Sequence, residues 1–251
     1  MSSSVIKDKG VLTTIITLSE VIKNKQYTFK AIDGSFHEVK TREGSFAYIT
    51  LGIVKGKILN SSFTIDELSY KEKLCENCNT EEIMREMEYE EALNSEKDVD
   101  LVFMDRKLSY DKFNLPVNII AIVKDPQVVD LDIEKSEPWL VEVYNEGKIR
   151  GAYFKLFNFS WIFLVETSSN LPWEEILAIL YILGREPIPE ALGYNYPLFL
   201  ADKVAKYYRD KESRILNFVT RNSTYRSFRS LIEKNRRGCR LTLSFRILRE
   251  G

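Results

Sequence analysis

The sequence predicts an α/β domain in which helices flank a mixed β-sheet. Three strand-like segments follow one another early in the chain, and helical segments then alternate with strand-like ones, an order typical of α/β or α+β folds. The chain of 251 residues is 44% hydrophobic, which is enough to bury a sizeable core. No segment has the composition of a linker, so we expect a single domain over residues 1–251.

The first part of the chain is expected to contain one helix and a three-stranded meander. Residues 11–23 are apolar with polar breaks, which suggests a helix. Residues 27–33 form the first expected strand, after which Gly34–Phe36 would turn the chain. Residues 45–54 would form a hairpin with the strand that follows them, turning at Lys55–Gly56.

The rest of the chain is expected to alternate helices with strands. Thr80 is the expected N-cap of a helix in which Glu81 and Glu82 suit the first turn. Residues 117–125 are almost wholly apolar, as expected of a strand that is covered on both faces. The elements expected after the meander are helices at 80–95, 172–185 and 197–221, strands at 99–105, 117–125 and 240–248, and a hairpin at 151–166.

The formal net charge of −1 conceals two segments of opposite charge. Residues 66–105 hold 14 Asp and Glu against 4 Lys and Arg, whereas residues 203–249 hold 14 Lys and Arg against 3 Asp and Glu. This asymmetry favours a basic surface that meets a polyanion. The first residues have no secretory signal, and the longest apolar runs are too short to span a bilayer, so we expect a cytoplasmic protein without membrane contact.

Three carboxylates stand out by their position. Asp33 and Asp105 each end an apolar strand-like run, although a strand-ending turn or a helix cap would explain either one alone. On the helix expected at 80–95, Glu88 shares a stripe with Ala92 and Met84, and Glu91 is the rival candidate.

Together these carboxylates indicate a site for a hard divalent cation such as Mn²⁺ or Mg²⁺, because such ions prefer oxygen ligands. An acidic pocket on a protein with a basic segment suits phosphodiester hydrolysis assisted by two metal ions.

Two motifs at opposite ends of the chain resemble those of the NurA nuclease family of archaea and some bacteria. They are "AIDGS" at 31–35 and "GYNYPLFLADKVAK" at 193–206. The resemblance implies a ribonuclease-H-like core and a homodimer that works with the hexameric HerA translocase. The implied activity is that of a metal-dependent single-strand endonuclease and 5′–3′ exonuclease in DNA end resection and double-strand break repair. Its DNA substrates would be single strands and duplex ends.

The resemblance also assigns site residues. It favours Glu88 over Glu91, because the family glutamate lies four residues before an alanine. Lys124 and Tyr194 would hold or orient the scissile phosphate. The implied metal ligands are Asp33, Glu88, Asp105 and Asp202, and the implied catalytic residues are these four with Tyr194.

The chain departs from the family pattern at four positions. Arg106 and Lys107 replace a Gly-Ser pair, Asp202 replaces a histidine, and Asn195 stands where proline is common. Asp202 could still bind a metal ion through oxygen, but it could not act as a neutral imidazole. These departures leave open a non-catalytic adaptor that binds DNA or HerA without cutting. A structural protein without a nucleic-acid role is a third reading, which would require the acidic residues to be dispersed.

Two further groups remain candidates for binding. The "CENC" pair, Cys75 and Cys78, would need Cys239 and His37 to complete a zinc site, so a free thiol pair or a disulfide is favoured. The basic tail interleaves arginine with aromatic residues, which suits contact with phosphates and stacking on bases, although a solvated basic helix is the alternative. The residues expected to bind nucleic acid are Lys124, Arg226, Arg229, Arg236 and Arg237.

Overall fold

The computed structural model describes residues 4–8, 11–17, 25–41, 44–111, 114–124, 126 and 137–221. The chain divides into two compact units, Met1–Arg209 and Asp210–Gly251. The first unit holds the whole described sheet and every candidate site residue placed below. The single domain expected over residues 1–251 stays a prediction.

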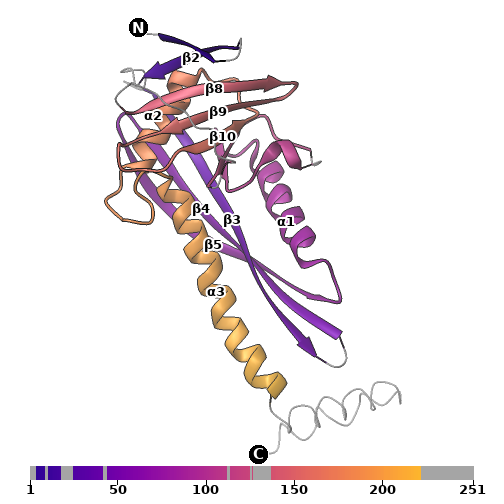
Figure 1. Cartoon of the computed structure of the whole chain (residues 1–251). Helices are drawn as coiled ribbons and strands as arrows, with labels where there is room; N and C mark the ends of the chain where they lie inside the picture. Colours follow the sequence, from indigo (N-terminus) through magenta and orange to yellow (C-terminus); the bar gives the residue numbers. More distant parts are fainter. Residues whose placement is uncertain are drawn as a thin grey trace, which may run out of the picture. The chain divides into compact units, whose positions relative to one another are not determined.

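A ten-stranded mixed sheet forms the centre of the first unit, as predicted (Figure 1). The strand order is β1-β2-β8-β9-β10-β7-β6-β3-β4-β5. Strand β6 runs parallel to both its neighbours, β3 and β7, whereas the other described pairs are antiparallel. The strands are β1 (Ser4–Asp8), β2 (Val11–Thr17), β3 (Gln26–Thr41), β4 (Gly44–Leu59), β5 (Ser62–Glu76), β6 (Leu101–Met104), β7 (Ile119–Val123), β8 (Trp139–Glu146), β9 (Ile149–Lys155) and β10 (Phe163–Thr167).

The described helices are α1 (Thr80–Ser95), the short 3₁₀ helix η1 (Leu108–Tyr110), α2 (Trp173–Gly184) and α3 (Tyr196–Arg221). Helix α1 covers one face of the sheet, where Tyr89 and Ala92 pack with Ile32 of β3. Helices α2 and α3 cover the other face, where Ala201 packs with Phe29. Ala31 lies in the same cluster as Phe29, so the neighbouring residues Ala31 and Ile32 point to opposite faces, as the alternation of a strand requires. None of the described helices is long and apolar enough to cross a membrane.

The meander predicted early in the chain is confirmed, but its strands are longer than expected. Strand β3 continues through Gly34–Phe36, so the predicted turn there is wrong. Strands β4 and β5 are joined by a turn at Asn60, whose φ of 56° places it in the left-handed region. The predicted turn at Lys55–Gly56 is also wrong, because a shift of the β4–β5 register occurs at this point within paired strands.

The predicted helix at 11–23 is wrong where the structure describes it. Val11–Thr17 is strand β2, which pairs with β1 and β8. Isoleucine, valine and threonine dominate this segment, and their branched side chains favour strands. Strand β8 was not predicted. The strand expected at 240–248 lies outside the described residues.

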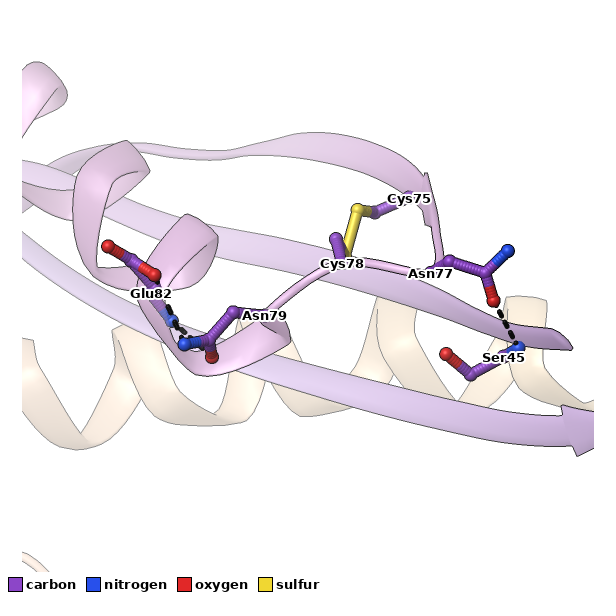
Figure 2. The surroundings of a disulfide bond; sticks show 6 residues. All are labelled: Ser45, Cys75, Asn77, Cys78, Asn79 and Glu82. Atoms are coloured by element: carbon purple, nitrogen blue, oxygen red, sulfur yellow. Dashed lines mark hydrogen bonds between the residues drawn. A yellow bond between two sulfur atoms is a disulfide. The ribbon is translucent and has the colours of Figure 1, made fainter.

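The connection from β5 to α1 carries a disulfide between Cys75 and Cys78 (Figure 2). This bond takes up both sulfur atoms of the zinc half-site that the sequence allowed. Asn79, not Thr80, is the N-cap of α1, and its side chain accepts a hydrogen bond from the Glu82 amide. The predicted helix bounds are otherwise confirmed.

Candidate active site

The candidate site lies where the short parallel strands β6 and β7 end while β3 continues. Met104, the last residue of β6, pairs with Ile32 of β3. The next residue in each chain segment is an aspartate, Asp105 and Asp33, so both aspartates come at the same level of the sheet. Burial, and then repulsion from the Asp105 carboxylate, raises the pKa of Asp33, in agreement with the closeness that the strand register gives the two side chains.

Glu88 approaches this point from α1. Its side chain is almost fully buried, and its Oε1 lies over Gly34 of β3. A Cβ atom at Gly34 would lie 2.4 Å from that oxygen and 2.6 Å from Cγ of Met84. The glycine after Asp33 therefore serves close helix packing and not a turn.

The rival, Glu91, belongs to a different cluster. Its carboxylate binds Lys30 at 2.9 Å and Lys71 at 2.5 Å, and Ser95 donates a hydrogen bond to its backbone carbonyl. Burial alone would raise the pKa of Glu91, but the two lysines lower it. Glu91 is thus a buried partner of lysines, while Glu88 faces Asp33.

Asp202 approaches from the opposite face on α3. Asn195 caps this helix by accepting a hydrogen bond from the Leu198 amide at 2.9 Å, which explains the asparagine that departs from the family pattern. Gly52, the partner of Asp33 in the β3–β4 ladder, lets the helix come close. A Cβ atom at Gly52 would lie 2.0 Å from the carbonyl oxygen of Ala201, the residue before Asp202.

The four carboxylates have unequal partners. The Glu88 carboxylate binds the Arg106 guanidinium, and the Asp105 carboxylate binds Lys124 at 2.5 Å. Asp202 binds Lys206, one turn later on α3, at 2.7 Å. The Asp33 carboxylate makes no hydrogen bond or ion pair with the described part of the chain. Burial, then Asp105 and Glu88, raise the pKa of Asp33 well above its usual range.

Tyr194 adds a buried hydroxyl beside these carboxylates. The side chain is 4% exposed, and its hydroxyl has no well-formed hydrogen bond to any described residue. The Lys124 Nζ lies 4.8 Å from the centre of its ring. Burial, with Asp105 and Asp33, raises the pKa of Tyr194, so the hydroxyl keeps its proton at neutral pH.

The oxygen atoms of these carboxylates and of the Tyr194 hydroxyl are chemically suited to bind a hard divalent cation. Carboxylate oxygens are the preferred ligands of Mg²⁺ and Mn²⁺, and the unpaired Asp33 and the unsatisfied Tyr194 hydroxyl leave polar atoms for a ligand. Within the described ranges, however, no three Asp, Glu, His or Cys side chains already form a metal cluster. Three of the four carboxylates are instead turned onto basic side chains.

The structure brings six of the predicted site residues together at one location: Asp33, Glu88, Asp105, Lys124, Tyr194 and Asp202. Sequence reasoning missed the basic side chains that pair with Glu88, Asp105 and Asp202, although the i,i+4 spacing of Asp202 and Lys206 is a readable signal. It also missed the role of Gly52, which only the sheet register reveals. Arg226, Arg229, Arg236 and Arg237 lie outside the described residues.

Comparisons with known proteins agree with this architecture. The sequence profile described as the NurA domain matches residues 27–131 and 115–207. The NurA nuclease from Sulfolobus solfataricus has a similar structure, with a TM-score of 0.56 and 16% identity over 79% of this chain and 86% of that one. Endonuclease V from Bacillus subtilis gives a TM-score of 0.49 and 17% identity over 79% of this chain and 88% of that one. No curated protein sequence matches.

At 16% identity, the Sulfolobus structure is evidence for the fold alone. It confirms the ribonuclease-H-like mixed sheet expected from the sequence.

Proposed function

Because the chain belongs to the NurA family, we propose that it is a metal-dependent deoxyribonuclease that hydrolyses phosphodiester bonds. The observation that supports this most is the convergence of four carboxylates at the carboxyl ends of β6 and β7. Asp105 directly follows β6, Asp33 lies beside it within β3, and Glu88 and Asp202 come from helices on opposite faces. A site at the carboxyl ends of parallel strands is a usual place for catalysis in open α/β sheets.

The four carboxylates would hold Mn²⁺ or Mg²⁺. When bound, such an ion would supply Lewis acidity toward a phosphoryl oxygen and a nucleophile at neutral pH. Asp33 is the central ligand in this account, because it alone of the four has no basic partner among the described residues.

Lys124 and Tyr194 would act on the phosphate. The Lys124 ammonium, held between Asp105 and the Tyr194 ring, would pair with a phosphate oxygen once the carboxylate turns to the metal. The Tyr194 hydroxyl would donate a hydrogen bond to the same group, since its raised pKa keeps it protonated. Both groups would orient the phosphate and stabilise charge that develops on it.

We further propose that the enzyme cuts single-stranded DNA internally and digests DNA from 5′ to 3′. It would work as a homodimer with HerA in DNA end resection and double-strand break repair. The strongly basic segment 203–249 supports a polyanionic substrate. The HerA partnership is proposed because membership of the NurA family implies it.

A second candidate function is a NurA-like adaptor that binds DNA or HerA without cutting. One observation favours it: Arg106 already neutralises Glu88, which would otherwise be a metal ligand. The adaptor would bind single-stranded DNA but leave it intact in any divalent metal.

A cleavage assay separates the two functions. The full chain is incubated with end-labelled single-stranded and duplex oligonucleotides in Mn²⁺, in Mg²⁺ and in EDTA. We expect cleavage that requires the ion and disappears in Asp33→Asn. Asp66→Asn is the matched control, because Asp66 pairs with Lys57 on the exposed meander. Intact DNA in every metal, with binding retained, would establish the adaptor.

A further inference from the structure

We propose that Arg106 is a built-in counter-cation that holds Glu88 and limits this site to one divalent ion per chain. The inference rests on the proposed function, since it concerns the metal ions that the same carboxylates would bind. It distinguishes this chain from a two-ion phosphodiesterase, in which a second ion would need the Glu88 carboxylate.

The contact between the two side chains is direct and buried. The Nε of Arg106 donates to Oε2 of Glu88, and the two side chains are 20% and 3% exposed. The other oxygen, Oε1, lies against Gly34. One carboxylate oxygen of Glu88 is therefore paired with Arg106, and the other is packed closely against the backbone of β3.

The Arg106 guanidinium is also held in place by its position in the chain and by further acidic neighbours. Arg106 directly follows Asp105, so its backbone is held at the end of β6. Burial by itself would lower the pKa of Arg106, but Glu88, then Asp111 and Asp33, raise it, so the guanidinium stays charged. Asp111 in turn accepts a hydrogen bond from Tyr89 at 2.6 Å and binds Arg85 at 3.3 Å. An arginine with these partners is a fixed part of the site and not a mobile surface side chain.

The charge balance of the site leaves room for one ion. Four carboxylates face three basic side chains, Arg106, Lys124 and Lys206. Lys206 is about half exposed and can turn into solvent, because an exposed i,i+4 pair contributes little. Without Lys206, the four carboxylates and the two remaining basic side chains have a net charge of −2, which one divalent cation neutralises. A second ion would place excess positive charge in a partly buried site.

In this arrangement Arg106 would do part of the work of a second ion. A guanidinium offers several donors in a rigid plane and cannot lose its proton, so it suits charge that develops on a phosphoryl group. In the absence of substrate, the Arg106 guanidinium is paired with the Glu88 carboxylate.

Metal binding tests the inference without any cleavage. The purified full chain is titrated with MnCl₂ by calorimetry, and the Mn²⁺ electron paramagnetic resonance spectrum distinguishes a lone ion from a coupled pair. We expect one ion per chain in the unmodified protein. Arg106→Ala should bind a second ion, or bind the first on the order of tenfold more tightly, because a repelling charge has gone.

Lys107→Ala is the matched control. It removes the same charge one residue away, but the Lys107 Nζ lies over the Tyr110 ring at 3.9 Å and not on a site carboxylate. It should bind Mn²⁺ as the unmodified chain does. Arg106→Gln, which keeps hydrogen-bonding groups, serves as the second variant if Arg106→Ala does not fold.

Two coupled ions in the unmodified chain would overturn the inference, as would unchanged stoichiometry and affinity in both Arg106 variants. These outcomes are distinct from failure of the proposed function. A chain that binds one ion but never cuts DNA would refute the nuclease and leave the role of Arg106 intact.

Discussion

The Asp33–Gly34 pair shows that an Asp-Gly sequence, which is common in turns, can also lie within a strand. The sequence allowed a strand-ending turn, but β3 runs straight through the pair, and Gly34 is needed because Glu88 and Met84 lie against it. Gly34→Ala should lower the free energy of unfolding by about 1–3 kcal/mol through overpacking. It should also weaken Mn²⁺ binding, since Glu88 must move. Chemical denaturation and calorimetry measure both effects, and an unchanged protein would contradict the packing argument.

Glu91 gives a pH prediction that is independent of the proposed metal ligands. Its pKa is lowered from 4.5 in the folded chain, so its contribution to stability is complete above pH 4.5 and is lost as the pH falls through the lowered pKa. Glu91→Gln leaves the buried Lys30 without its charge partner and should cost about 3 kcal/mol at pH 7. Urea unfolding from pH 7 downward should show this difference shrinking below pH 4.5. A difference that does not change with pH would rule out the ion pair as its source.

At the scale of elements, the way α3 begins decides where Asp202 lies. Asn195 caps the helix, and Asp202 follows within its second turn. Asn195→Ala should lower stability by about 1 kcal/mol, because a helix amide loses its acceptor. DNA cleavage should fall as well, since Asp202 is held less firmly. Asn195→Ser keeps a capping oxygen and should recover most of both losses in thermal unfolding and cleavage rate. Equal losses in the two variants would show that capping is not the cause.

The elements also show which structural features a sequence can predict. Helix α1 was predicted with its correct bounds, because its acidic first turn is a local signal, although the cap is Asn79 and not the predicted Thr80. Val11–Thr17 was mistaken for a helix, because its strand state depends on pairing with β8, more than 120 residues later in the chain. The candidate site followed the same rule. The two aspartates that follow apolar runs were visible locally, although Asp33 lies within β3 and not at its end. The ion pairs of Glu88 and Asp105 depend on tertiary packing.

At the scale of the whole molecule, the chain combines an acidic site with a basic segment. Binding of single-stranded DNA should weaken steeply between about 50 and 200 mM salt, because phosphate contacts release counterions. Replacing Arg226, Arg229, Arg236 and Arg237 with alanine should reduce the slope of affinity against salt by about three to four. Fluorescence anisotropy with a labelled oligonucleotide measures the slope. A slope equal to that of the unmodified chain would remove these arginines from the DNA interface.

The central claim is that the carboxylates around Asp33 hold a divalent ion for phosphodiester hydrolysis. Its most direct test is the single-turnover cleavage rate of single-stranded DNA, measured against Mn²⁺ concentration for the unmodified chain, Asp33→Asn and Asp66→Asn. The account predicts a saturable dependence on Mn²⁺, a loss on the order of a thousandfold in Asp33→Asn, and no loss in Asp66→Asn. Cleavage that persists in EDTA, or that survives the loss of the Asp33 carboxylate, would contradict the claim.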